Sequence, residues 1–391
     1  MASRVFFHIG LPKTGTSFLQ SILWSNREEL RRQGMLLPGV ERRDHLWASC
    51  VVREDPHVGR RNRLAESSWA RLREEISRWP GDAVISHEFF SSASGKQAGA
   101  AIDDLAPAEV HVVVTARDTL DLFVSGWQEA IKNKQTVALG RFCASASENP
   151  LVVWDWRALD LSRVLERWST QVPGEHVHVI PLTRAPTDQD ELWYRFATVL
   201  GVAPDGIDSS GGFRNPSLGV VEIETLRRIN ARLEGFNSAF DRGIWVRTYL
   251  ADERLAPRGG ERFWPSPAQI ADCRDRGARA VQFTRERHFD VVGRLDDLLT
   301  PDDLPARRHP DSVTDSEVAA VAVDLVATLL SDVRRLRNIQ RAPTHNQAEV
   351  PKNRLIRDLL RRFPLLERLA REKRKVLTPL HVSDSPDSPR E

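Results

Sequence analysis

The apolar residues of this chain fall into short runs separated by longer amphipathic segments. The run Val110–Thr115 is continuous enough for a central strand with both faces covered. Three further runs have strand character, and the segments between them repeat their apolar positions with the period of a helix. Strands that alternate with helices in this way predict an α/β fold with a parallel sheet. The three further strands are expected at Val5–Ile9, Ala83–Ser86 and Val177–Pro181.

The amphipathic segments predict helices along the whole chain, and helices dominate its second half. The predicted fold class is therefore α/β, a three-layer core with a central parallel sheet flanked by helices, plus a helical C-terminal part. Residues 38–65 are rich in Arg and His and lack a regular period, so we expect an irregular insertion or lid, with His45 in a solvated loop. The helices are expected at Thr16–Arg32, Ser67–Trp79, Leu120–Lys132, Leu161–Thr170, Gln189–Leu200, Ser217–Leu233 and Val318–Ile339.

The composition narrows the class of protein. The 391 residues are 28% charged and 41% apolar with a net charge of +2, which is typical of a globular domain and argues against a dedicated nucleic-acid binder. No apolar run is long enough for a transmembrane helix, and the strand-like start shows no secretory signal. The three cysteines are far apart, so we expect a reducing compartment, no zinc site and a cytoplasmic location. They are Cys50, Cys143 and Cys273.

The C-terminal part is expected to differ from the core. Residues 1–340 are predicted to form one domain, followed by a linker at 341–351, a basic amphipathic helix at 352–377 and a disordered tail at 378–391. A basic amphipathic helix can lie on an anionic membrane, which would place the protein peripherally at the inner membrane surface. The same pattern fits equally well a helix that packs on the domain or on a dimer partner.

The segment HIGLPKTGTSFLQ, His8–Gln20, carries the strongest chemical signal. It follows a predicted strand and opens a predicted helix, so its backbone N–H groups and the helix N-terminus form a cradle for an anion. Gly10 and Gly15 let the backbone approach the anion closely. Lys13 supplies a cation. The hydroxyl donors are Thr14, Thr16 and Ser17.

This loop departs from the ATP-binding pattern G-x-x-x-x-G-K-[ST]. Its Lys comes two residues before the second Gly, and no Asp directly ends an apolar strand, since Asp118 follows Val110–Thr115 only after two other residues. The groups that would hold a magnesium ion are therefore missing. A terminal sulfate carries less negative charge than a terminal phosphate and has less need of a metal. The sequence therefore favours a sulfuryl donor over ATP.

A second motif, TARDTLDLFVSGW, begins at the end of the strand Val110–Thr115. Arg117 stands at the carboxyl end of that strand, where ligands of open α/β sheets bind. Ser125 follows slightly more than two helical turns later, and the guanidinium and the hydroxyl can converge on one phosphate. The alternative is an ion pair of Arg117 with Asp118 or Asp121.

Together the two motifs resemble those of the PAPS-dependent sulfotransferases, bacterial members in particular (PAPS is 3′-phosphoadenosine 5′-phosphosulfate). PKTGTSFLQ is similar to the family's 5′-phosphosulfate loop and RDTLDLFVSGW to its 3′-phosphate motif. The segments Trp154–Leu182 and Arg214–Asn230 resemble bacterial members as well, so residues 1–340 look family-like. The resemblance implies a P-loop-type fold, PAPS as co-substrate and no metal requirement. It implies that PAPS is bound by Pro12, Lys13, Thr14, Gly15, Thr16, Ser17, Phe18, Arg117 and Ser125.

In-line sulfuryl transfer needs a base near the transferred group. The strand that ends at Ser86 leads directly into His87 and Glu88, and members of the family use either a His or a Glu near this point. Adjacent residues of an extended chain point to opposite faces, so one of the two serves. We expect Glu88, with His87 as the alternative. Lys13 would stabilise charge on the leaving bridging oxygen.

The expected activity is transfer of a sulfuryl group to a hydroxyl or amine, and the acceptor can be a glycan, a glycolipid or a specialised metabolite. Two other functions remain open. A nucleotide-dependent kinase or NTPase would need magnesium, and a non-catalytic nucleotide- or glycan-binding module would be indifferent to loss of the base. Family members often have a late basic loop on the 3′-phosphate. Arg258-Gly259-Gly260 is a candidate for this loop, but we expect these residues to form a plain surface turn.

Overall fold

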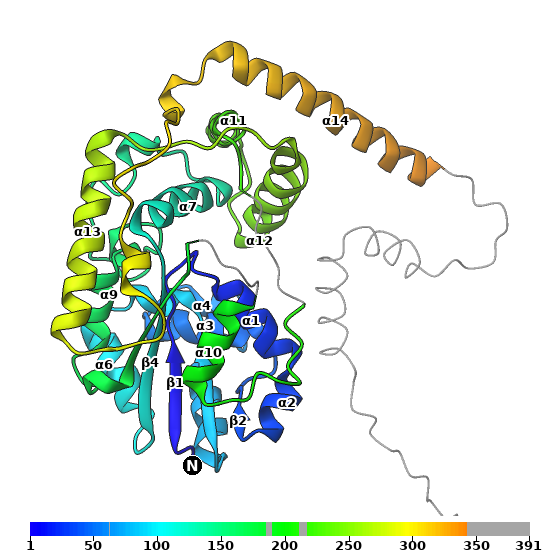
Figure 1. Ribbon diagram of the computed structural model, residues 1–391. Coiled ribbons are helices and arrows are strands. Elements are labelled where there is room, and N and C mark those ends of the chain that lie inside the picture. Colours follow the sequence, from blue (N-terminus) through cyan, green and yellow to red (C-terminus); the bar gives the residue numbers. More distant parts are fainter. Residues whose placement is uncertain (62, 185–189, 211–216, 342–391) are drawn as a thin grey trace, which may run out of the picture. The chain divides into compact units, whose positions relative to one another are not determined.

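The computed structural model describes residues 1–61, 63–184, 190–210 and 217–341. Within them six strands form one sheet in the order β2-β3-β1-β4-β5-β6, and every neighbouring pair is parallel (Figure 1). The predicted α/β class and parallel sheet are confirmed. The strands are β1 (Arg4–His8), β2 (Met35–Leu36), β3 (Asp82–Ser86), β4 (Glu109–Ala116), β5 (Val177–Pro181) and β6 (Asp290–Val291).

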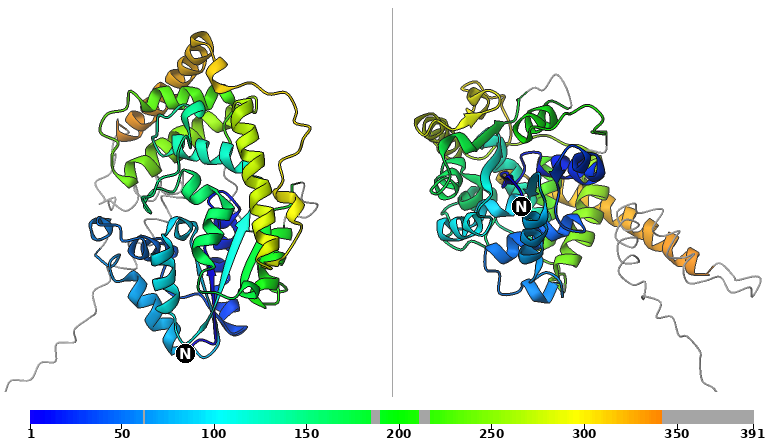
Figure 2. Two further views of the ribbon diagram at one scale, coloured as in Figure 1. Left: turned by 90° about the vertical axis from the view of Figure 1, so that its left-hand side faces the viewer. Right: turned by 90° about the horizontal axis from the view of Figure 1, so that it is seen from below.

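Helices flank the sheet, and the second half of the described chain is mainly helical, as predicted (Figures 1 and 2). The predicted helices are present, although one is divided in two. The α-helices are α1 (Thr16–Ser25), α2 (Arg27–Arg32), α3 (Arg42–Val52), α4 (Val58–Arg61), α5 (Ser68–Arg78), α6 (Gly95–Asp103), α7 (Thr119–Lys132), α8 (Trp156–Leu159), α9 (Leu161–Trp168), α10 (Glu191–Leu200), α11 (Val220–Asn230), α12 (Ala239–Asp241), α13 (Pro267–Glu286) and α14 (Asp315–Arg341). A π-helix, η4 (Arg242–Leu255), and short 3₁₀ turns complete the structure; the turns are η1 (Glu88–Ser92), η2 (Leu139–Arg141), η3 (Gly174–His176), η5 (Ala256–Arg258), η6 (Leu295–Leu298) and η7 (Pro310–Ser312).

The predicted single helix Thr16–Arg32 is in fact two helices, α1 and α2. They meet at Asn26, whose backbone leaves the helical region (φ −110°, ψ 24°). The side-chain amide of Asn26 donates a hydrogen bond to the carbonyl oxygen of Ile22 at 2.9 Å. An Asn side chain that competes for the backbone in this way explains why the helix stops there.

The expectation of an irregular insertion at residues 38–65 is wrong, because α3 and α4 lie there. Helix α3 begins with a capping box, in which Glu41 and Asp44 satisfy each other's backbone N–H groups. Helix α3 packs against α5, and Trp47 lies on its buried side. His45 lies on this buried side as well and not in solvent.

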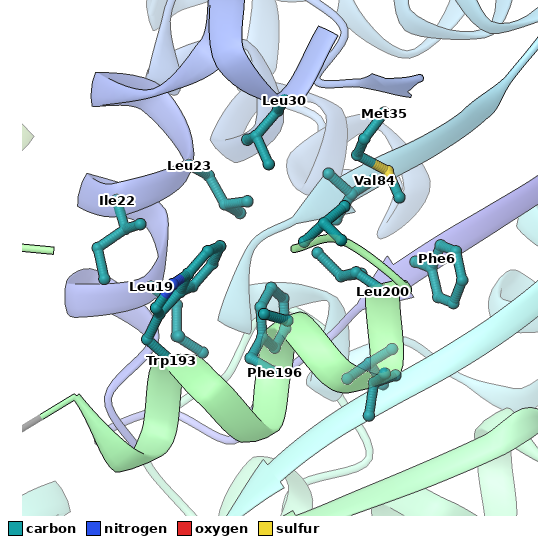
Figure 3. Packing of buried hydrophobic residues seen from close by; sticks show 14 of the residues in the cluster. Phe6, Leu19, Ile22, Leu23, Leu30, Met35, Val84, Trp193, Phe196 and Leu200 are labelled. Atoms are coloured by element: carbon teal, nitrogen blue, oxygen red, sulfur yellow. The ribbon is translucent and has the colours of Figure 1, made fainter. Parts of the chain in front are cut away.

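One half of the core lies between the sheet and the helices α1, α2 and α10 (Figure 3). Leu19 and Leu23 of α1 face Trp193 and Phe196 of α10, and Phe6 of β1 extends the same cluster across the sheet. All five side chains are almost completely removed from solvent. This packing holds α1, and hence the loop before it, against the sheet.

The other face of the sheet is covered by a second aromatic cluster. Phe7, the next residue of β1, points the opposite way, because successive residues of a strand alternate between faces. Its ring centroid lies 4.7 Å from that of Phe90, 4.9 Å from Trp168 and 5.9 Å from Trp69. Burying each of these rings contributes roughly 1.5–3 kcal/mol. With both faces covered, the core has the three predicted layers, and β1 is fixed from two sides.

The chain divides into a compact unit, Met1–Val326, and a second unit, Ala327–Glu391. No described helix combines the length and the apolar character that crossing a membrane requires. Several predicted features lie outside the described residues: the linker 341–351 apart from its first residue, the basic helix 352–377, the tail 378–391 and the start of the segment Arg214–Asn230.

Candidate functional site

A cavity of about 1050 Å³ opens at the carboxyl ends of the central strands. The strand order places β1 between β3 and β4, and the segment after each of these strands contributes to the cavity wall. The three segments supply Lys13, Glu88 and Arg117, respectively after β1, β3 and β4. The topology therefore joins three parts of the chain that the sequence singled out, at the edge where parallel α/β sheets bind ligands.

The loop between β1 and α1 has a backbone conformation that depends on its glycines. Gly10, Lys13 and Gly15 have positive φ angles of 47°, 68° and 81°. A Cβ atom at Gly15 would overlap the side chain of Leu192, so a larger residue would be both strained and blocked there. The tight turn brings Lys13 and the start of α1 to the same part of the cavity wall.

Thr14 anchors this loop to the neighbouring strand. Its hydroxyl donates to the carbonyl oxygen of Leu11 at 2.6 Å and lies 2.7 Å from the hydroxyl oxygen of Thr115 in β4. The N–H of Leu11 donates to the carbonyl oxygen of Thr115 at 2.9 Å. Thr14 is buried, and neither Thr14 nor Pro12 lines the cavity. In this structure Thr14 therefore fixes the loop rather than facing the cavity.

Helix α1 begins at the cavity wall. Its N-cap is Gly15, which has no side chain to offer, so the N–H groups of the first turn have no partner within the helix. Thr16, Ser17 and Phe18 all line the cavity, together with Lys13. The positive end of the helix dipole and the ammonium group make this part of the wall suited to an anion.

Lys13 is paired with a carboxylate that the sequence analysis missed. Its Nζ lies 3.0 Å from Oε2 of Glu129 on α7. The other oxygen of Glu129 is 2.8 Å from Nη1 of Arg247 in η4 and accepts a hydrogen bond from Asn133 at 3.1 Å. Burial raises the pKa of Glu129, but Arg247 and Lys13 outweigh burial and hold the pKa below its ordinary value. Glu129 is therefore an ionised carboxylate between two cations.

Arg117 and Ser125 line the same cavity. Nη2 of Arg117 is also 3.0 Å from Oδ2 of Asp121, so the ion pair considered as an alternative is present. Such a partly exposed pair is worth about 0–1 kcal/mol, which leaves the guanidinium able to bind a ligand anion. Asp118 caps α7 by accepting the N–H of Asp121 at 2.9 Å and does not line the cavity.

Besides Arg247, two further arginines from the second half of the chain line the cavity, Arg262 and Arg307. The Arg307 guanidinium lies over the ring of Trp264, 3.8 Å from its centroid. Burial and the nearby Arg262 lower the pKa of Arg307. Arg258, considered for a late basic loop, does not line the cavity and instead pairs with Asp324 at 3.1 Å. The arginines that the second half of the chain contributes to the cavity are therefore Arg247, Arg262 and Arg307, on either side of Arg258 in the sequence.

Glu88 lines the cavity, and its carboxylate is oriented by a short relay. Nε2 of Gln20 donates to Oε2 of Glu88 at 3.0 Å, and the oxygen of the same amide accepts from Arg42 at 2.7 and 3.0 Å. Burial raises the pKa of Glu88, but the interactions with His87, Arg42 and Gln20 together lower it to about 2. Glu88 is thus ionised at neutral pH, in the protonation state that a base requires, although the lowered pKa makes it a weaker base than an ordinary carboxylate.

His87 is less suited to that role. It does not line the cavity, and its Nδ1 accepts the N–H of Phe89 at 3.1 Å. The neutral ring therefore carries its proton on Nε2 and has no free lone pair. Burial lowers the pKa of His87 to about 4, so the ring is neutral at pH 7. Of the two residues predicted from the sequence, the geometry favours Glu88.

Two aromatic side chains line the cavity near Glu88. Phe89 and Trp154 have ring centroids 6.3 Å apart and nearly perpendicular planes. They give this part of the wall an apolar surface on which a flat or sugar-like group can pack. Three other tryptophans are buried in the core instead; they are Trp127, Trp156 and Trp168.

Comparisons with known proteins found few proteins that resemble this chain. No protein-family model matches the chain, and no curated protein matches it. Among solved structures, a sulfotransferase domain from the curacin biosynthetic pathway is similar at 12% sequence identity, with a TM-score of 0.31. The match covers 52% of this chain and 75% of that one. A likeness of this size assigns no function, which has to come from the residues of the cavity.

Proposed function

We propose that this protein is a sulfotransferase that transfers a sulfuryl group from PAPS to a hydroxyl or amine of its acceptor. One observation carries the proposal. A single cavity is lined by Lys13 and the first turn of α1, by Arg117 and Ser125, and by the carboxylate of Glu88. The first two groups suit the two anionic ends of the donor, and the Glu88 carboxylate suits the role of the base.

PAPS has a 5′-phosphosulfate and a 3′-phosphate, and the cavity offers a cationic region for each. The 5′-phosphosulfate would bind at the start of α1, where the backbone and the hydroxyls of Thr16 and Ser17 donate hydrogen bonds and Lys13 supplies charge. The 3′-phosphate would bind to Arg117 and Ser125, and Arg262 and Arg307 add positive charge to the same cavity.

The chemistry supported by this arrangement is an in-line displacement at sulfur. The acceptor oxygen or nitrogen forms a bond to sulfur while the bond from sulfur to the bridging oxygen of the donor breaks, which releases adenosine 3′,5′-bisphosphate (PAP). Glu88 accepts the proton that the acceptor loses. Lys13 stabilises the negative charge that develops on the bridging oxygen.

Glu129 is a buried carboxylate of the cavity, but it is a poor base. Both of its oxygens are already bound, one to Lys13 and the other to Arg247 and Asn133. Protonating Glu129 would leave two cations without their partner, which is costly in a buried site. Its role in the proposed reaction is to position the Lys13 ammonium.

The acceptor would bind near Glu88, beside Phe89 and Trp154. An apolar wall next to a base fits a glycan, a glycolipid or a specialised metabolite that presents a hydroxyl or amine. No acceptor is singled out among these classes by the described residues.

The first experiment is calorimetric titration with PAP in EDTA, with ATP as the comparison. We expect micromolar binding of PAP and little binding of ATP. Lys13→Ala and Arg117→Ala should each weaken PAP binding at least about tenfold, because each removes a charge-assisted hydrogen bond worth about 1.5–3 kcal/mol. Arg258→Ala is the matched control, since Arg258 is an arginine that does not line the cavity.

The outcomes separate the competing functions. Absent PAP binding, or ATP binding of equal strength that appears with magnesium, would refute the sulfotransferase and favour a kinase. PAP binding without any transfer from labelled PAPS to a panel of glycans, glycolipids and amines would favour a nucleotide-binding module. Transfer in EDTA supports the proposal directly.

A further inference from the structure

A second group of polar side chains lies at the opposite end of the sheet from the cavity. Glu109 begins β4 and His111 follows two residues later, so both point to the same face of the sheet. His176 ends the turn η3 just before β5, and His178 is the second residue of β5. Because β4 and β5 are parallel neighbours, the four residues gather at the amino ends of these strands, at the lower edge of the sheet in Figure 1.

Three of these side chains bring metal-binding atoms together. Oε1 of Glu109 lies 2.7 Å from Nε2 of His111 and 3.8 Å from Nε2 of His176, and the three groups offer ligand atoms within 4.8 Å of one another. Tetrahedral zinc, with bonds of about 2.0–2.1 Å, separates its ligand atoms by roughly 3.4 Å. The observed separations of 2.7 and 3.8 Å lie on either side of this value.

A chain of close contacts runs from Asp290 through His178 and His111 to Glu109. Nδ1 of His178 lies 2.7 Å from the Asp290 carboxylate, and Nε2 of His178 lies 2.8 Å from Nδ1 of His111. Two neutral imidazoles supply one N–H each, so when these two contacts are hydrogen bonds no ring proton is left for Glu109. In a neutral His111 the remaining nitrogen, Nε2, then has a lone pair, and it faces the Glu109 carboxylate at 2.7 Å. Two acceptors this close repel each other unless a cation lies between them.

We propose that Glu109, His111 and His176 bind a divalent metal ion, and that zinc is the ion they suit best. Imidazole nitrogen and carboxylate oxygen are ligands that zinc prefers. His111 also has what metal-binding histidines usually have, a partner that orients the ring through its other nitrogen. The side chains of Glu109 and His176 are 51% and 22% exposed, so an ion can enter from solvent and keep a position for water.

The neighbouring cation does not fill this place, and the site is too far from the cavity to take part in its chemistry. Arg4 pairs in register with Glu109, but its guanidinium is bound to Asp82 at 3.1 Å. The eight residues of β4 separate Glu109 from Arg117 by about 26 Å at roughly 3.3 Å per residue. A bound ion would join β4 to the turn before β5 and stabilise the sheet, independently of the proposed function.

The test is calorimetric and thermal titration of the metal-stripped full-length protein with zinc chloride. We expect one ion per chain and a melting temperature that rises with zinc concentration. His176→Ala and Glu109→Gln alter partly exposed side chains, so both variants should fold, and each should weaken zinc binding at least roughly tenfold. His57→Ala, which removes an exposed histidine elsewhere, is the matched control and should bind zinc like the wild type.

PAP binding in EDTA, measured on the same variants, keeps this proposal separate from the donor site, because His176→Ala should leave it unchanged. The absence of saturable zinc binding would overturn the metal site. Zinc binding that persists in both cluster variants, or that is lost in His57→Ala, would overturn it as well. In those cases a protonated His111 imidazole, and not a metal ion, pairs with the Glu109 carboxylate.

Discussion

Lowering the pH from 7 to 5 should strongly destabilise this protein, because three histidines are buried around the end of β3. Burial lowers the pKa of His8 to about 3 and the pKa values of His45 and His87 to about 4. Ser86 joins two of the rings: its hydroxyl lies 2.8 Å from Nδ1 of His8, and its N–H donates to Nδ1 of His45 at 3.1 Å. In the unfolded chain each histidine has a pKa of about 6.5.

The sign and size of the effect follow from proton linkage. Each folded pKa is lowered, so the unfolded chain binds more protons between about pH 6.5 and 4, and stability falls as the pH falls through that window. From pH 7 to 5 each histidine costs roughly 2 kcal/mol, and the three together cost roughly 6 kcal/mol. That is a large part of a typical stability of about 5–15 kcal/mol. With an unfolding entropy of about 2.1 cal/mol/K per residue over Met1–Val326, the melting temperature should fall by about 9 °C.

Urea denaturation followed by tryptophan fluorescence at pH 7, 6 and 5 measures the slope of the unfolding free energy against pH. Between pH 6 and 5 we expect about 3–4 kcal/mol per pH unit, close to three protons. Glu88 should not contribute there, because its lowered pKa removes stability only below about pH 4.5. His45→Gln should reduce the slope by about one proton, and His57→Gln, at an exposed position, should not change it. A wild-type slope of less than one proton would refute the reasoning.

Three further predictions concern the cavity. Glu88→Gln should leave PAP binding within about twofold and lower the rate of transfer by about 10²- to 10⁴-fold, because it removes the base; an unchanged rate contradicts that role. Gly15→Ala places a Cβ against Leu192 at a positive φ, so PAP titration should show binding lost, and an unchanged affinity would count against the anion cradle. Thr14→Val removes three buried hydrogen-bonding contacts and should lower the urea-derived unfolding free energy by about 1–3 kcal/mol, whereas Thr14→Ser, which keeps the hydroxyl, should lower it by much less.

The sheet and the two motifs after β1 and β4 could be predicted from the sequence, because each is a local pattern. Four of the six residues in the run Val110–Thr115 are valines, and the run proved to be the middle of a strand paired on both sides. By contrast, β2 and β6 have only two residues each, too few to show any period. Helix α3 was missed because its arginines obscure an apolar side that only its packing against α5 makes visible.

The rest of the cavity could not be predicted because it depends on contacts between distant parts of the chain. Glu129 reads as one more polar residue of an amphipathic helix, and only its contacts with Lys13 and Arg247 make it part of the site. Arg262 and Arg307 belong to segments without a motif. Residues of this kind become recognisable when the fold brings their charges to a common wall.

The pairing of Lys13 with Glu129 makes ligand binding an exchange of counter-ions. The ammonium group that would meet a sulfate or phosphate is already neutralised from within the protein, at 3.0 Å. An incoming anion must therefore compete with a fixed carboxylate, which a singly charged ion such as chloride does poorly and a donor with several charges does well. Because few mobile ions need to be held at Lys13, its contribution to binding should depend only weakly on salt concentration. The fixed counter-ion Glu129 thus makes the cavity favour anions with several charges over singly charged anions of similar shape.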